Sequence, residues 1–209
     1  MHDSKLVWVT PEADNLVAWM ARVSSPDNQN NKETAPRLVS YLIRNRHFSP
    51  FEMVNACVEI NTTRDIGRQL LRHRSFTFQE FSGRYAAYEE LLTEREYRLQ
   101  DKTNRQNSIE IAQPPAWGAW VEDLAKKAAG LYEVLLKEGV AKEVARAFLP
   151  EGLVPTKMYM NGTIRSWIHY VNERTAPGVQ KEHRLLAESI KETVFSQLPI
   201  IREAAFGVH

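Results

Sequence analysis

The stretch from residue 54 to residue 60 constrains the fold more than any other part of this 209-residue chain. Apolar side chains recur there at every second position, which places them on one face of a β-strand. Cys57 falls between them and points to the opposite face. The stretch therefore predicts a strand whose apolar face is formed by Val54, Ala56, Val58 and Ile60.

Other segments show either the strand period or the helix period. Residues 5–10 and 155–161 predict further strands, and a short strand is expected at 96–100. Apolar residues at helical spacing predict helices at 10–24, 36–46, 64–74, 117–137, 140–148, 163–171 and 180–197. Thr10 and Thr63 are expected to cap the first and third of these helices. Helices combined with few strands predict an α+β fold with one antiparallel sheet.

The remaining segments carry weaker signals. Residues 76–87 keep neither period and predict an ordered loop, and the polar residues 101–113 are typical of a linker. The longest helical pattern predicts an inward face formed by Val121, Leu124, Ala128, Leu131 and Leu135. The length predicts one domain covering residues 1–209, with room for an appended lobe.

Composition excludes several classes of function. The 27 basic and 26 acidic residues give a net charge of +1, so no basic excess points to nucleic acid, and any anion site has to be local. The single cysteine, Cys57, excludes an internal disulfide and fits a reducing compartment. The cysteine and the six histidines show no zinc-ligand spacing, so no metal is expected. With no signal-peptide pattern and no run of about 18 apolar residues, we expect a cytoplasmic chain without membrane contact.

The segment from residue 64 to residue 85 carries the strongest chemical signal. Arg64, Arg68 and Arg72 are four residues apart and are predicted to share one helix face. Ser82-Gly83-Arg84 follows and combines a hydroxyl, a small residue and a guanidinium, as phosphate binding requires. A solvated basic helix face beside a polar turn is the alternative. It is weakened by the scarcity of acids in the helix and by four nearby aromatics, Phe76, Phe78, Phe81 and Tyr85.

A second group of polar residues lies near the C-terminus. Arg165 and His169 are four apart on one predicted helix face, and Arg174 follows just beyond it. By itself, His169 is better interpreted as a packed histidine without a ligand. No Gly-x-Gly-x-x-Gly pattern follows a strand, so a dinucleotide would not be bound in Rossmann fashion.

Arg72-His73-Arg74, followed after seven residues by Ser82-Gly83-Arg84-Tyr85, resembles the signature of flavin-dependent thymidylate synthases. Flanking stretches resemble the same family at residues 21–24, 47–52, 143–150 and 161–174, so the resemblance spans about residues 21–182. It implies a central antiparallel sheet flanked by helices, in a homotetramer whose FAD and dUMP sites lie between subunits. It also implies conversion of dUMP to dTMP, with 5,10-methylenetetrahydrofolate as carbon donor and NADPH-reduced FAD as hydride donor.

The resemblance assigns residues to each ligand by position. Those expected at FAD are Ser49, Arg72, His73, Arg74, Glu80, Thr163, Arg165 and His169. Those expected at dUMP are Gln69, Arg72, Glu80, Phe81, Ser82, Gly83, Arg84, Arg146 and Arg174. Arg174 is the expected catalytic residue, because a guanidinium that stays protonated would stabilise negative charge on the uracil ring.

The chain departs from the usual family pattern at several positions. Thr77 and Gln79 replace the usual Ser and Asn of the central motif, and Thr163 replaces a frequent Asn. Met53 and Gly178 stand where His is frequent, which makes the folate and flavin contacts there the least secure.

Two other functions are weighed against this one. Cys57 has no neighbouring base in sequence, and Ser82 has no paired general base, so neither is predicted to be a nucleophile. A non-catalytic protein that grips RNA or a nucleotide phosphate through residues 64–84 is the main rival, and the near-neutral charge argues against RNA. A flavoprotein of the same fold without synthase activity is the second rival, and the presence of Arg174 argues against it.

Overall fold

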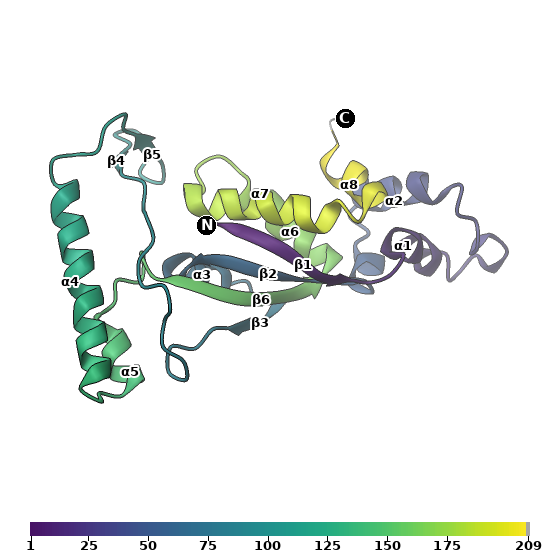
Figure 1. The fold of residues 1–209 in the computed structure, drawn as a ribbon. Helices are drawn as coiled ribbons and strands as arrows, with labels where there is room; N and C mark the ends of the chain where they lie inside the picture. The colour runs from purple at the N-terminus through teal and green to yellow at the C-terminus, as the bar shows by residue number, and fades with distance from the viewer. Residues whose placement is uncertain (208–209) are drawn as a thin grey trace.

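The protein is described by a computed structural model that covers residues 1–207 and is organised around one antiparallel sheet (Figure 1). The strands lie in the order β1-β2-β6-β3 and each pairs antiparallel with its neighbour. Their bounds are β1 Asp3–Val9, β2 Asn55–Thr63, β6 Pro155–Thr163 and β3 Phe76–Glu80. The antiparallel sheet among helices confirms the predicted α+β class, whereas the expected homotetramer and single domain stay predictions.

One face of the sheet is covered and the other is open. The alternating residues predicted for β2 are fully buried, together with Met158 and Met160 of the neighbouring β6. They form one core with three helices, α3 (Arg64–Leu70), α6 (Ile164–Arg174) and α7 (Lys181–Phe195). The opposite face carries exposed side chains such as Lys157, Tyr159 and Gln79.

A second group of helices packs beside the sheet and brings early helices of the chain against its last helix (Figure 1). It contains α1 (Ala13–Ala21), α2 (Ala35–Arg44) and α8 (Pro199–Phe206), with the 3₁₀ turns η1 (Pro26–Asn28) and η2 (Ser49–Glu52). The sequence analysis missed α8. Asp14 of α1 is buried, and its two carboxylate oxygens accept hydrogen bonds from the backbone N–H groups of Ile200 and Ile201, both at 3.0 Å. These are otherwise unpaired donors in the first turn of α8.

Thr63 is the N-cap residue of α3 as predicted, whereas Thr10 is not the N-cap of α1, and neither threonine hydroxyl makes a capping hydrogen bond. The residue before α1 is Glu12, in a left-handed conformation with φ 50°, while the Thr10 hydroxyl accepts from the backbone N–H of Asn55 at 2.9 Å. Thr63 precedes α3, but its hydroxyl donates to the Asp65 carboxylate instead of accepting from the helix backbone. In both cases a nearer or stronger partner takes the hydroxyl.

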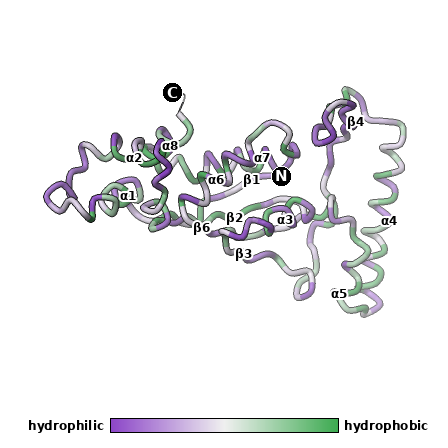
Figure 2. The backbone as a smooth tube through the Cα atoms, turned by 180° about the vertical axis from the view of Figure 1, so that it is seen from behind, coloured by the Kyte–Doolittle hydropathy of each residue, from purple (hydrophilic) through white to green (hydrophobic). Residues whose placement is uncertain are grey.

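A long helix stands away from the sheet. It is α4 (Gly118–Lys137), which contacts α5 (Lys142–Ala145) and the 3₁₀ turn η3 (Arg146–Phe148) around a small core. Tyr88, Tyr132, Ala145, Leu149 and Val154 form this core. Figure 2 shows hydrophobic turns along α4 although it lies apart from the sheet. The predicted inward face is wrong, because Leu124 is 69% exposed and Val121 and Leu131 are exposed as well.

Two predicted loops contain strands. Residues 76–87 begin with β3, which pairs with β6 from Phe76↔Gly162 to Glu80↔Met158. Its alternation is too short to be recognised, and the pairing itself stabilises it. The predicted linker at 101–113 contains β5 (Ser108–Glu110), which forms a hairpin with β4 (Arg98–Gln100). Asp101 closes this hairpin by accepting from the backbone N–H groups of Thr103 and Asn104, at 2.8 and 3.1 Å.

The bonds of Asp14 generate a test of how the two ends of the chain stabilise each other. Asp14→Ala leaves two buried N–H groups of α8 without a partner, so we expect the free energy of unfolding to fall by about 1–3 kcal/mol. Urea denaturation followed by circular dichroism measures it. Asp27→Ala, at an exposed position in η1, is the control and should change stability by less than about 0.5 kcal/mol. Equal effects of the two substitutions would contradict the capping role.

Candidate active site between helices α3, α6 and α7

The segment predicted to carry the chemistry follows β2 and returns to the sheet as β3. The predicted helix over residues 64–74 ends earlier, because α3 stops at Leu70 and the chain turns through residues 71–75. Arg64 and Arg68 lie on α3, whereas Arg72 lies beyond its end, so the predicted face of three arginines within one helix is wrong. Arg64 donates to the Tyr88 hydroxyl at 2.7 Å, and Arg68 pairs with Glu151 at 3.4 Å.

A basic cavity of about 380 Å³ opens beside α3. Its charged lining includes three arginines, Arg64, Arg68 and Arg146, and apolar side chains of the small core close its floor. Arg84 pairs at 2.9 Å with Glu143, which also lines the cavity. Three arginines and two glutamates, Glu143 and Glu151, therefore line one hollow large enough for a phosphate-bearing ligand, and Arg84 is paired to one of these lining glutamates. Arg84 and Arg146 are the two of these arginines expected at dUMP.

The residues that precede Arg84 reach the same region through Tyr88. A Cβ atom added to Gly83 would lie 2.6 Å from the Tyr88 ring, so only glycine fits there. Phe81 packs against the same ring at a centroid distance of 5.2 Å. Ser82 accepts through its backbone carbonyl from the N–H of Tyr85 at 3.0 Å and so forms a turn. The tight packing holds the Ser82–Arg84 turn against the wall of the cavity.

A second group of predicted residues meets between α3 and α6. The Nε atom of Arg174 donates to Nε2 of His73 at 3.1 Å. Burial, together with the positive charge of Arg174, lowers the pKa of His73 to about 4, so the ring is neutral and accepts this bond. Among residues 1–207, Arg174 makes no ion pair with a carboxylate, and its charge remains available to a ligand.

Gln69 connects this group to residues that the sequence analysis missed. Its side-chain amide contacts Gln180 and His183, which are three residues apart at the start of α7. Burial and the nearby Arg174 charge lower the pKa of His183 to about 3. Gln180 is the N-cap residue directly before α7 and His183 lies in the first turn of that helix, and this short spacing was the only signal in the sequence.

The other predicted residues lie in three places. Arg165 pairs with Glu52 of η2, and Ser49 lies in the same turn. Thr163 accepts from the backbone N–H of Ser166 at 3.2 Å and caps α6, while the Glu80 carboxylate accepts from the Thr156 hydroxyl at 2.9 Å. Arg72, Arg74 and His169 are exposed, and no side-chain hydrogen bond or ion pair involves them within the part of the chain described. The structure thus brings together Gln69, His73 and Arg174, and separately Phe81, Ser82, Gly83, Arg84 and Arg146.

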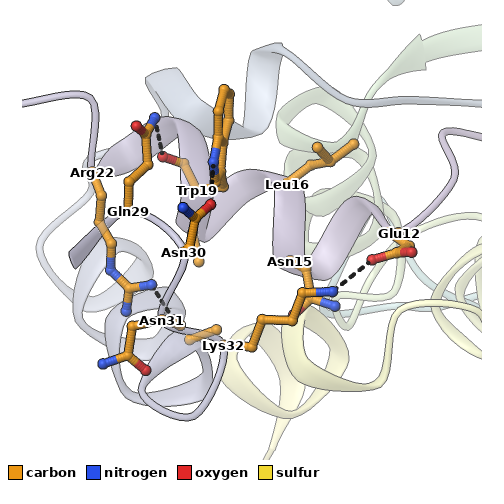
Figure 3. A pocket seen from close by; sticks show the side chains of 11 residues that line it. Glu12, Asn15, Leu16, Trp19, Arg22, Gln29, Asn30, Asn31 and Lys32 are labelled. Carbon is orange, nitrogen blue, oxygen red and sulfur yellow. Dashed lines mark hydrogen bonds and ion pairs between the residues drawn. The ribbon is translucent and has the colours of Figure 1, made fainter. Parts of the chain in front are cut away.

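A smaller hollow of about 170 Å³ lies elsewhere, between α1 and the segment that leads to α2 (Figure 3). Trp19, Asn30 and Lys32 line it, and the buried guanidinium of Arg22 closes one end with bonds to Asn31 and Thr34. None of the predicted site residues lines this hollow.

Comparison with known proteins shows which family the chain belongs to. The family model described as "Thymidylate synthase complementing protein" matches residues 5–200. The chain belongs to this family. A protein of Paramecium bursaria Chlorella virus 1 named "Probable flavin-dependent thymidylate synthase" is 45% identical over 195 residues, covering 92% of this chain and 90% of that protein. A flavin-dependent thymidylate synthase of a Synechocystis species is 42% identical, with 91% and 88% covered.

A solved structure of another protein shows the same arrangement of elements. The crystal structure of the UMP/dUMP methylase PolB from Streptomyces cacaoi, bound with 5-Br dUMP, superposes with a TM-score of 0.86 at 25% identity. It covers 98% of this chain and 94% of PolB. The family membership and the mixed helix and sheet fold inferred from the motif at residues 72–85 are therefore confirmed.

Membrane-spanning helices and metal centres are both missing from the described part of the chain. Across residues 1–207, no helix combines the length and the apolar character needed to cross a membrane. Within the same residues, no three side chains of His, Cys, Asp or Glu gather in a way that could hold a metal ion.

The lowered pKa values of the two buried histidines generate a prediction about pH. The unfolded chain takes up protons at histidine near pH 6.5, whereas the folded site does not until about pH 4 or below. The contribution of these two histidines to the free energy of unfolding is therefore fully present above pH 6.5, and it is lost as the pH drops toward 4. His183→Asn removes one of these rings, so its stability should decline less than that of the parent between pH 6.5 and 5. Urea denaturation at several pH values measures this, and parallel pH curves for the two proteins would contradict it.

Proposed function

We propose that the chain is a flavin-dependent thymidylate synthase that methylates dUMP to dTMP. The observation that carries the proposal is Arg174, whose guanidinium lies 3.1 Å from a neutral histidine and has no carboxylate partner among the described residues. A cation left uncompensated at a partly buried position is suited to an anionic ligand or to negative charge that develops during a reaction. The names of the relatives support the same activity.

The donor set fits FAD. Arg72 and Arg74 are exposed and unpaired within residues 1–207, and His73 lies between them in sequence, so two guanidinium groups are free for a diphosphate. Arg165, His169, Ser49, Thr163 and Glu80 are the further FAD contacts that we propose. When bound, FAD reduced by NADPH supplies the hydride that the methyl group requires. The one-carbon unit is proposed to come from 5,10-methylenetetrahydrofolate.

The nucleotide is proposed to lie with its phosphate at the arginines of the basic cavity. Ser82, Gly83, Arg84 and Arg146 would hold the phosphate and ribose, with Gln69, Arg72, Glu80 and Phe81 completing the site. Arg174 is the proposed catalytic residue because it would face the uracil ring, where it favours the ionised form. The 5-Br dUMP in the PolB structure supports a pyrimidine nucleotide as the ligand.

No protein nucleophile is needed in this proposal. Cys57 is buried in β2, and burial raises the pKa of its thiol, so it is poorly suited to attack a ring carbon. Its position in the sheet explains the residue as a packing side chain.

A homotetramer is part of the proposal, as is a cytoplasmic location without membrane or nucleic-acid partners. The exposed apolar residues of α4 support assembly, since Trp120 is 77% and Leu124 is 69% exposed on a helix that packs on little else. The open sheet face supports it too. Because the basic cavity and the His73–Arg174 pair occupy different places, residues from neighbouring subunits would complete each site.

Flavin uptake and product formation test the function directly. Dialysed protein mixed with FAD should quench the flavin fluorescence or shift the flavin absorbance. Adding dUMP, 5,10-methylenetetrahydrofolate and NADPH should then yield dTMP. UMP in place of dUMP shows whether the enzyme also accepts the ribonucleotide, a question raised by PolB, which is named a UMP/dUMP methylase. A protein that binds FAD but forms no methylated nucleotide would be a flavoprotein without synthase activity. The absence of flavin binding would overturn the assignment.

Arg174 and Arg84 should fail in different ways. The phosphate is far from the reacting carbon, so Arg84→Ala mainly weakens dUMP binding, by about 1.5–3 kcal/mol. Negative charge develops on the uracil, so Arg174→Ala lowers turnover at saturating dUMP by roughly 100-fold or more. Arg174→Lys rescues it poorly because a point charge does not reproduce the planar guanidinium.

Steady-state dTMP formation across a dUMP titration separates these effects, and reduction of FAD by NADPH alone is the control that the flavin site is intact. Normal turnover of Arg174→Ala at saturating dUMP would place the nucleotide elsewhere. An unchanged KM for dUMP in Arg84→Ala would do the same.

A further inference from the structure

The side-chain amide of Gln69 is held from both sides by residues of α7. Its Nε2 donates to Oε1 of Gln180 at 2.7 Å, and its Oε1 lies 3.0 Å from Nδ1 of His183. Gln180 and His183 are 111 and 114 residues away in sequence. Both contacts therefore depend on the tertiary fold, which brings the start of α7 to the side chain of Gln69 on α3.

The bonds continue from Gln180 to a buried ion pair. Nε2 of Gln180 donates to Glu182 at 3.1 Å, and Glu182 accepts from the guanidinium of Arg98 at 2.6 and 2.8 Å. The side chains of Arg98 and Glu182 are 10% and 9% exposed. Arg98 comes from the β4–β5 hairpin, which is also tied to α7 by ion pairs of Lys181 with Glu96 and Glu110. The start of α7 is thus anchored on the side away from Gln69.

The charge of Glu182 sets the direction of every bond in this chain. An ionised carboxylate only accepts, so Gln180 has to present its NH₂ group to Glu182 and its carbonyl to Gln69. Gln69 then has to present its own NH₂ group to Gln180 and its carbonyl to His183. The proton on His183 must consequently lie on Nδ1. Turning either amide around would bring two acceptors or two donors face to face.

The environment of His183 agrees with this single arrangement. The residue is 1% exposed, and its ring lies 6.2 Å from the ring of His73 and 5.9 Å from that of Tyr170, measured between centroids. Burial lowers the pKa of His183 to about 3, so the ring carries one proton only. Within residues 1–207 its Nε2 atom is buried without a hydrogen-bond partner, as expected of the unprotonated nitrogen.

We propose that His183 and Gln180 are positioning residues that fix the amide of Gln69 in one orientation for the pyrimidine nucleotide, with Glu182 setting the direction. Each amide can make four hydrogen bonds, and these two partners leave Gln69 one N–H and one carbonyl lone pair. The fixed pair matches a ligand group that offers an acceptor beside a donor, such as a ring imide or a hydroxyl. The inference rests on the proposed function, which places Gln69 at dUMP.

Substitutions at His183 test the proposal. His183→Phe keeps a packed ring but removes the donor to the Gln69 carbonyl, so that only the bond to Gln180 still holds the Gln69 amide. We expect the KM for dUMP and the equilibrium Kd for dUMP to rise about tenfold, as for the loss of one hydrogen bond, with kcat at saturation within about twofold of the parent. His183→Asn places an amide N–H near the position of Nδ1 and should bring both constants back to within about threefold. His2→Phe is a matched control, because it removes another histidine Nδ1 bond, to Thr62, and should leave dUMP affinity unchanged.

A double-mutant cycle with Gln69→Ala separates positioning from general packing. If His183 acts through Gln69, then His183→Phe adds nothing to the loss already caused by Gln69→Ala. Additive losses, or failure of His183→Asn to rescue a folded His183→Phe, would overturn the proposal while leaving the proposed function in place. Gln69→Ala that leaves dUMP affinity unchanged would instead show that the nucleotide lies elsewhere, and this inference would fall with that placement.

Discussion

The pairing of β2 with β6 is the constraint on which the rest of the structure depends. Nine residues of each strand pair without interruption, from Asn55↔Thr163 to Thr63↔Pro155. A helix follows each strand directly, and the two exits are held alike. The N–H of Arg64 donates to the carbonyl of Val154 at 3.0 Å, and the N–H of Ile164 donates to that of Val54 at 2.9 Å. Because the strands are antiparallel, α3 begins at one end of the pair and α6 at the other, and both cover the same face. This arrangement lets the end of α3 meet the side of α6.

That meeting point determines the charge state of the candidate site. His73, Tyr170 and His183 crowd together, with ring centroids 5.1 to 6.2 Å apart, and leave little water to stabilise an imidazolium. The pKa values of both histidines fall for this reason first and because of Arg174 second. Arg174 remains the charged group, since a guanidinium keeps its proton where imidazoles lose theirs. In a chain with a net charge of only +1, the candidate site thus keeps one partly buried cation that has no carboxylate partner among residues 1–207.

The sequence predicted those parts of the fold that local periodicity determines. The strands at residues 54–60 and 155–161 and the helices after them were readable because most of their apolar residues face one core. The strand β3 was not, because five residues with only Phe76 and Phe78 turned inward depend on pairing with β6. The inward face of α4 was misread for the opposite reason, since its large apolar residues are exposed and Ala125 and Tyr132 are buried. In the site, the motif at residues 72–85 indicated the arginines, but no local pattern connects Gln69 to residues more than 100 positions away.

The proposed assembly offers one physical explanation for both the exposed side of α4 and the division of the candidate site. A helix that buries only a small core keeps Trp120, Leu124 and Val134 in contact with water, which costs free energy in an isolated subunit. The arginines of the basic cavity lie near this helix. His73 and Arg174 lie on the covered side of the sheet, and the other face of the sheet is open. A second copy of the chain that covered these surfaces would remove the apolar exposure and could bring one subunit's Ser82–Arg84 turn toward another subunit's Arg174. Assembly and completion of the site would then be the same event, so that neither the cavity arginines nor Arg174 would need to bind the whole nucleotide alone.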